Sequence, residues 1–183
     1  YEVTMHPQIG VKSADNAVMM REMARATSQR LNDPITFTPI RYPNAVGNGV
    51  HIHMSFLDDD GNPATYDPTG PGGLSKPARH FVAGLLKHLP TIIAFASPSA
   101  ISYERLAPHR WSAAYNNLGY RDRGACVRIC PVADLPGLDV AKQFNFEFRA
   151  GDSTASPYLQ LASAVLAGID GIRNEMEPPE PTE

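Results

Sequence analysis

The strongest constraint on the fold is a strict alternation of aromatic and polar residues over positions 143–149, which read Gln-Phe-Asn-Phe-Glu-Phe-Arg. Successive side chains of a β-strand point to opposite faces of the sheet. The pattern therefore predicts a strand that buries its phenylalanines in a core. Asn145, Glu147 and Arg149 then share the other face.

A second strand is predicted over residues 47–57, where His51, His53 and Ser55 share one face and apolar residues share the other. Residues two apart on one face lie about 7 Å from each other. A histidine of this strand and Glu147 of the other can therefore reach one divalent ion. A solvated outer sheet face is the plainer interpretation. A metal hydrolase that uses His51, His53 and Glu147 is a further alternative.

The remaining elements follow from apolar spacing, caps and prolines. Helices are predicted at residues 13–31, 75–89 and 157–174, with Ser13 and Ser156 as caps and Pro90 as a stop. Short strands are predicted at 36–40 and 126–130, and a long loop at 97–123. On the last helix the predicted buried stripe comprises Tyr158, Leu161, Val165, Leu166, Ile169 and Ile172. Together these predict an α+β fold, an antiparallel β-sheet with helices packed on one face.

Composition narrows the function classes. Among the 183 residues, 43% are apolar, and the formal net charge is −3. This balance argues against a nucleic-acid partner or a polybasic membrane binder, and no apolar run approaches the ~20 residues of a membrane span. Cys126 and Cys130 are predicted to be reduced thiols of a cytoplasmic protein. The chain begins without an initiator methionine or a signal region, as expected for a cut from a larger protein.

Arginines gather in the second half of the chain, at positions 105, 121, 123, 128 and 149. Guanidinium groups match phosphates and carboxylates. Several of them near one metal ion would suit phosphoryl transfer. The sequence contains no P-loop and no nucleophile elbow.

Four segments, in this order, resemble the catalytic domain of the glutamine synthetase family. They are Gly49-Val50-His51-Ile52-His53-Met54-Ser55, Ser102-Tyr103-Glu104-Arg105-Leu106 with Pro108, Arg121-Asp122-Arg123-Gly124-Ala125-Cys126-Val127-Arg128-Ile129, and Glu147-Phe148-Arg149 followed by Asp152 and Ala155-Ser156-Pro157-Tyr158-Leu159. The resemblance covers nearly the whole chain. It implies a catalytic domain over residues 1–176, incomplete in this chain, followed by a loose acidic proline-rich tail at 177–183.

The resemblance also implies an activity, an ATP-dependent ligase that joins glutamate to ammonia or an amine through γ-glutamyl phosphate. His51 and Glu147 would hold one Mg²⁺ or Mn²⁺, and Glu2 would belong to a second metal site. Arg105 and Gly47 would bind the glutamate substrate. The family forms homo-oligomeric rings with sites between subunits, so the chain alone is expected to be inactive.

The remaining roles concern the phosphates and the carboxylate that becomes activated. The resemblance implies that Arg123 and Arg149 are catalytic, and that Arg149 also binds the side-chain carboxylate of glutamate. It assigns the nucleotide to His53, Ser55, Arg123 and Arg128.

Three departures from the family pattern concern the amine and the nucleotide. Trp111 stands where glutamine synthetases carry a glutamate that helps bind and deprotonate ammonium, and tryptophan accepts no proton. Asn145 replaces an arginine near the nucleotide, and Val46 replaces an asparagine near the glutamate amino group. The interpretation is a glutamate–amine ligase whose amine pocket includes Trp111. The alternative is a catalytically idle scaffold or assembly protein.

Overall fold

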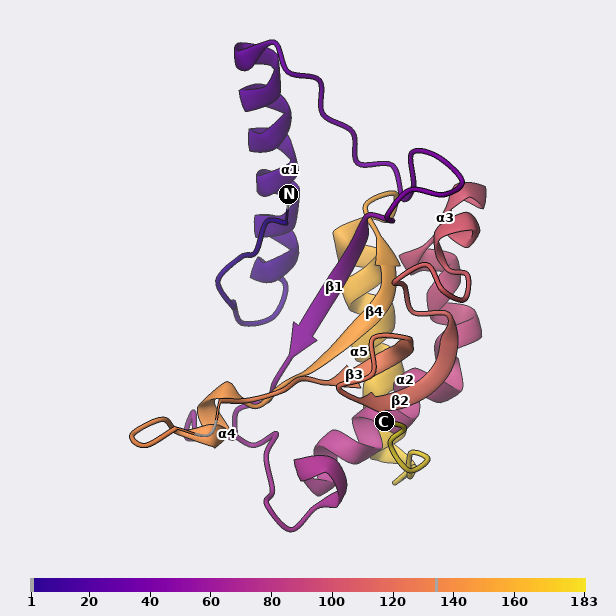
Figure 1. The fold of residues 1–183 in the computed structure, drawn as a ribbon. Coiled ribbons are helices and arrows are strands. Elements are labelled where there is room, and N and C mark those ends of the chain that lie inside the picture. The colour runs from indigo at the N-terminus through magenta and orange to yellow at the C-terminus, as the bar shows by residue number, and fades with distance from the viewer. Residues whose placement is uncertain (1, 134) are drawn as a thin grey trace.

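A mixed β-sheet forms the centre of the computed structural model, which describes residues 2–133 and 135–183. The strands lie in the order β1-β4-β3-β2 (Figure 1). β4 pairs antiparallel with both β1 and β3, whereas β2 joins β3 in parallel. The strand bounds are β1 Gly49–Met54, β2 Tyr115–Tyr120, β3 Ala125–Ile129 and β4 Phe146–Asp152. The α+β fold is confirmed, and the pairing is antiparallel across the three strands that carry the candidate site. The predicted antiparallel pairing does not extend to β2, which pairs with β3 in parallel.

Two long helices cover one face of the sheet, as predicted (Figure 1). The helices are α1 Lys12–Leu31, α2 Lys76–Ala96, α3 Ala100–Arg105, α4 Val140–Gln143 and α5 Pro157–Arg173, with a 3₁₀ turn η1 at Pro71–Gly73. α2 packs on β2, β3 and β4, and α5 packs mainly on α2. Among the described residues, no helix is both long enough and apolar enough to cross a membrane.

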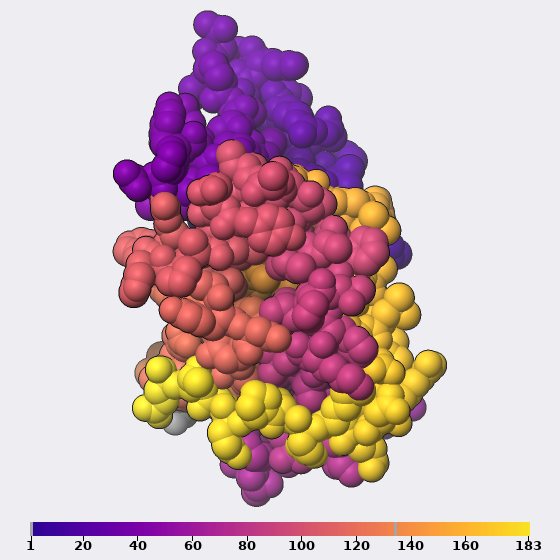
Figure 2. Space-filling view, turned by 90° about the vertical axis from the view of Figure 1, so that its right-hand side faces the viewer, coloured from indigo at the N-terminus to yellow at the C-terminus, as the bar shows by residue number. Residues whose placement is uncertain are grey.

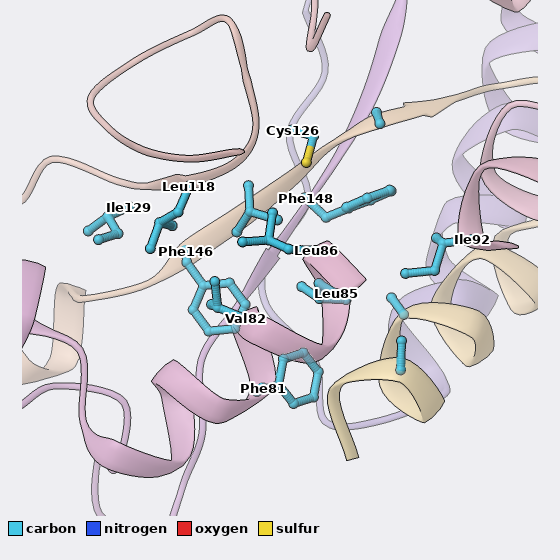
Figure 3. Close-up of a cluster of buried hydrophobic side chains, with 14 of the residues drawn as sticks. Phe81, Val82, Leu85, Leu86, Ile92, Leu118, Cys126, Ile129, Phe146 and Phe148 are labelled. Carbon is cyan, nitrogen blue, oxygen red and sulfur yellow. The ribbon is translucent and has the colours of Figure 1, made fainter. Parts of the chain in front are cut away.

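The core lies between α2 and the strands (Figure 3). Phe146 and Phe148 of β4 are fully buried, which confirms the prediction for the alternating strand. Phe81 of α2 meets Phe146 with ring centroids 5.8 Å apart. Such tilted aromatic pairs add to the stabilisation by burial. One face of β4 is therefore fixed in the core, and its other face is left for polar side chains.

The predicted end of the second long helix and the predicted loop after it were both wrong. Pro90 lies inside α2 instead of ending it. The residues beyond it, Ile92 and Ala96, are fully buried, so their burial offsets the hydrogen bond that proline removes. Residues 97–123, predicted as a long loop, contain α3 and β2.

α5 buries its small residues, contrary to the predicted stripe of large ones. The buried positions include Ala164, Ala167, Gly168 and Gly171, whereas Leu166 is 68% exposed. A Cβ on Gly171 would lie only 2.0 Å from the His80 carbonyl oxygen of α2. The small residues therefore let the two helix backbones approach closely. The Ser156 side chain makes no capping hydrogen bond.

α1 stands beside the sheet and contacts α5 (Figure 1). Arg21 donates to the Ser153 and Ala155 carbonyl oxygens, and Tyr158 donates to Asp15. Only Ala14 of this helix is buried.

The helix at α1 was predicted correctly, but its cap was not. Ser13 lies within the helix and donates to the Gly10 carbonyl, and Val11 occupies the N-cap without a side-chain bond. Residues 36–40 form no strand.

The tail at residues 177–183, expected to be loose, lies along β2 in this structure (Figure 2). Thr182 donates its N–H to the Leu118 carbonyl at 2.9 Å, and its own carbonyl accepts from Tyr120 N–H at 2.7 Å. Arg79 of α2 pairs with Glu177 at 3.3 Å. The tail thus covers the β2 edge of the sheet.

Candidate functional site

The candidate site lies on the sheet face opposite α2, where β1, β4 and β3 lie side by side. Register places His53 of β1 and Arg128 of β3 on either side of Glu147 of β4. Direct cross-strand neighbours on one face have Cβ atoms about 5 Å apart. The prediction that the polar faces of two strands converge is therefore confirmed, and β3 adds a third.

Glu147 is the centre of the cluster, and its carboxylate is 1% exposed. Oε1 faces two guanidinium groups, with Arg128 Nε at 2.5 Å and Arg149 Nη1 at 2.6 Å. Oε2 faces two imidazoles, with His53 Nε2 at 3.1 Å and His51 Nδ1 at 3.5 Å. The two oxygens thus have different neighbours, arginines on one side and histidines on the other.

The two histidines experience opposite electrostatic environments. Desolvation, followed by the charge of Arg149, lowers the pKa of His51 to about 4. Interactions with Cys130 and then Glu147 raise the pKa of His53 to about 10. At neutral pH the His51 ring is therefore uncharged, whereas the His53 ring carries a proton.

Burial by itself would raise the pKa of the Glu147 carboxyl. The interactions with His53 and Arg149 outweigh it and lower that pKa to about 2. The carboxylate is therefore ionised throughout the neutral range. A buried charge of this kind requires partners, which the arginines supply.

Arg105 reaches the cluster from the end of α3. Its side chain is 2% exposed, and Nη2 donates to the Gly151 carbonyl at 2.9 Å. A Cβ on Gly47 would lie 2.5 Å from Arg105 Cγ, and one on Gly49 2.8 Å from Arg105 Nη1. The two glycines therefore leave the space through which Arg105 passes. Burial lowers the pKa of Arg105, and a guanidinium group keeps its charge in proteins.

Several buried guanidinium nitrogens lack a hydrogen-bond partner among the described residues. In the cluster they are the Nε atoms of Arg105 and Arg149. An unsatisfied buried donor is costly. These N–H groups can donate hydrogen bonds to an anionic ligand without displacing a protein partner.

Cys130 is the site residue that the sequence analysis missed. Its Sγ lies 3.5 Å from His53 Nδ1, and the side chain is 7% exposed. Cys130 follows Arg128 by two positions, so strand alternation places both on one face. This two-residue spacing from Arg128 was the feature of the sequence that could have identified Cys130. Cys126 and Cys130 are both free thiols, as predicted.

Four predicted site residues lie outside the cluster. Glu2, Arg123 and Ser55 are exposed, and none of them is among the described residues that pair with Glu147. Trp111 is 81% exposed, in a loop where its φ is 54°. The roles assigned to these four stay predictions.

The donor atoms present fit a divalent cation. Glu147 Oε2 is buried and faces imidazole nitrogens instead of the arginines, and the neutral His51 ring lies 3.5 Å from it. Carboxylate and imidazole together suit Mn²⁺, and carboxylate oxygen suits Mg²⁺. His51 and Glu147 therefore have suitable chemistry for ligands, and their role in metal binding stays a prediction.

Comparisons with known proteins agree on one family. Residues 1–183 match the family model described as glutamine synthetase, catalytic domain. Glutamine synthetase of Frankia alni is 39% identical over 93% of this chain and 35% of the relative. The Thermotoga maritima enzyme of the same name is 36% identical over 100% of this chain and 40% of the relative.

A solved structure described as a novel glutamine synthase homolog superposes with a TM-score of 0.87 at 44% identity. The match covers 93% of this chain and 40% of that one. The chain thus spans between 35% and 40% of the length of these relatives.

Proposed function

The chain belongs to the glutamine synthetase family, and from this premise we propose that it forms part of an ATP-dependent carbon–nitrogen ligase. The reaction joins the γ-carboxylate of glutamate to an amine through γ-glutamyl phosphate. One observation carries the proposal: the buried Glu147 carboxylate holds two guanidinium groups on one oxygen and faces two imidazoles with the other.

Arginines bind the two carboxylates of glutamate in this proposal. Arg105 takes the backbone carboxylate beside Gly47, and Arg149 takes the carboxylate that becomes phosphorylated. The unpartnered Nε atoms of both side chains support these roles. Their charges hold two anions close to a triphosphate, which would otherwise repel them.

The nucleotide lies toward β1 and β3 in the proposal. Arg128 and Arg123 bind its phosphates, and His53 and Ser55 line its position. His51 and Glu147, with Glu2 at a second position, would hold Mg²⁺ or Mn²⁺, which neutralises phosphate charge when bound. Arg149 and Arg123 keep the developing charge of the transferred phosphoryl group stabilised.

An organic amine is the proposed nucleophile. Trp111 replaces a family glutamate that would take a proton from ammonium, and its indole accepts none. Its exposed ring offers a surface for an alkyl stem or a cationic amine. Specificity would then come from apolar and cation–π contacts.

The rest of the site lies outside this chain in the proposal. The relatives are more than twice as long. The working enzyme is accordingly a cytoplasmic homo-oligomeric ring in which other segments and neighbouring subunits complete the pocket.

The test is ADP release by the full-length protein with ATP, Mg²⁺ and glutamate. Ammonia is compared with alkyl, aryl and polyamine substrates. We expect release with at least one organic amine that exceeds release with ammonia. Equal or better turnover of ammonia would contradict the amine assignment, and no release with any amine by folded protein would favour the scaffold.

A variant pair tests the site itself. Arg149→Ala should lower kcat/KM by about 10²- to 10³-fold, because it removes a charge aimed at the reacting group. Arg121→Ala is the matched control, since its guanidinium lies on the exposed Tyr120 ring. Equal effects of the two substitutions would contradict the assigned role of Arg149.

A further inference from the structure

Three side chains that can bind a metal converge from three strands. His53 comes from β1, Glu147 from β4, and Cys130 from the residue after β3. One ligand atom of each lies within 4.8 Å of the other two. Cys130 is not among the ligands of the Mg²⁺ or Mn²⁺ position proposed above.

A second observation points to a ligand at this place. Glu147 Oε2 is buried in a carboxylate that is 1% exposed, and the groups that face it are ring nitrogens of His53 and His51, which can themselves ligate a metal. It faces His53 Nε2 at 3.1 Å. Because both arginines lie on Oε1, Oε2 remains available to a cation.

The net charge around Glu147 shows why a thiolate from Cys130 would favour binding of a divalent cation. Once His53 has released its proton to act as a ligand, one carboxylate surrounded by Arg128 and Arg149 leaves a net charge of about +1, which opposes a dication in the absence of nucleotide. The thiolate of Cys130 would bring this sum to zero. Asn145, which stands where the family resemblance expects an arginine, adds no positive charge and keeps His53 Nδ1 at 2.9 Å from its Oδ1.

We propose that His53, Cys130 and Glu147 form a binding site for a borderline divalent cation of the Zn²⁺ type. A sulfur, a nitrogen and an oxygen donor match the ligands of Zn²⁺, and thiolate discriminates against Mg²⁺. Binding releases the Cys130 thiol proton, with any proton on His53, to solvent. The fourth position is open to water or to a ligand.

The site also bears on the proposed ligase, because Zn²⁺ there engages His53 and Glu147. It does not depend on that function, since the cation binds without ATP or glutamate. The experiment therefore measures metal binding alone. Its outcome is separate from any result on ADP release.

The test titrates the metal-free full-length protein with Co²⁺, which takes zinc sites and reports sulfur ligation by a charge-transfer absorption in the near ultraviolet. We expect this band at one Co²⁺ per chain, and we expect Zn²⁺ but not Mg²⁺ to abolish it. Cys130→Ser should remove the band and weaken Zn²⁺ binding at least ~10-fold, since even outer-shell changes cost that much.

Cys126→Ser is the matched control. That thiol lies on the same strand, but its Sγ contacts Asn116 Oδ1 and Asn117 O at 3.7 Å. The variant should keep both the band and the Zn²⁺ affinity, and circular dichroism should show that both serine variants fold. Absence of the band in the wild-type protein, or its persistence in folded Cys130→Ser, would overturn the proposal. A Zn²⁺ affinity unchanged by Cys130→Ser would overturn it as well.

Discussion

At the scale of single residues, Glu147 combines a structural and a chemical role. Its Oε1 neutralises Arg128 and Arg149, and its Oε2 faces the histidines. Because the group is buried, either role fails if the negative charge is lost. The carboxylate therefore holds the cluster together before any substrate arrives.

Glu147→Gln should lower the free energy of unfolding of the chain by about 3–5 kcal/mol, because it leaves two guanidinium groups without their counter-ion. Urea denaturation monitored by circular dichroism, without added metal, measures this change. Glu104→Gln on the exposed side of α3 is the matched control and should shift stability by less than ~0.5 kcal/mol. A Glu147→Gln effect no larger than that of the control would refute this role.

The reactivity of the Cys126 thiol reports whether β3 is buried. Desolvation raises the pKa of the Cys126 thiol to about 12. Below that pH the thiolate, which is the reactive form, is scarce. Iodoacetamide should therefore modify Cys126 in the folded chain very slowly from pH 7 to 9, as mass spectrometry would show. In the denatured chain its labelling should rise with pH through about 8.5. Similar rates in both states would mean that Cys126 is not buried.

The polar half of the site was predictable because strand alternation is a local rule. Asn145, Glu147 and Arg149 share a face by parity alone, as do His51 and His53. Cys130 obeyed the same parity with Arg128. Its nearness to His53 depends on sheet order, which no local pattern encodes.

At the scale of elements, α5 shows what periodicity leaves undecided. Its large and its small apolar residues both recur at helical spacing, and the large ones were predicted to be buried. The structure buries the small ones, because Gly84 and Gly171 bring α2 and α5 into backbone contact. Which stripe is covered depends on the shape of the partner helix.

Gly171→Ala should destabilise the chain by about 1–3 kcal/mol, since the added carbon would meet the His80 carbonyl oxygen at 2.0 Å. Leu166→Ala on the exposed face of the same helix should change the free energy of unfolding by less than ~0.5 kcal/mol. Denaturant midpoints of both variants measure the difference. A larger loss of stability in Leu166→Ala than in Gly171→Ala would indicate that the large apolar residues of α5 are buried, as the sequence pattern predicted.

Proline and loop signals failed for a related reason. A proline such as Pro90 usually ends a helix, but Ile92 and Ala96 are buried two and six residues later. Residues 97–123 are polar and irregular in sequence, yet β2 forms there by pairing with β3. In both places a tertiary contact outweighs the local preference.

At the scale of the whole molecule, the tail closes one edge of the sheet. Thr182 exchanges two backbone hydrogen bonds with β2. An unpaired strand edge invites pairing with another chain. The tail therefore protects the β2 side of the sheet in this chain.

Removal of residues 177–183 should lower the denaturation midpoint and raise self-association. Each lost hydrogen bond is worth about 1 kcal/mol, and the freed edge becomes available to other chains. Thermal denaturation and light scattering measure the two effects. The single substitution Glu180→Gln in the same tail is the control. Truncated protein that stays monomeric with an unchanged midpoint would show that the tail does not protect the edge.

The sequence separation between β1 and β4 determines when the two strands can pair during synthesis of the chain. His51 and Arg149, neighbours in the cluster, are separated by 98 positions. At a translation rate of about 5–20 residues per second, β1 leaves the ribosome roughly 5–20 s before its partner β4. Long-range pairing of this kind is slow, because a large loop must close before any contact rewards it. The charge cluster can thus assemble only after β4 has been synthesised, and until then β1 lacks the partner strand that it has in the folded sheet.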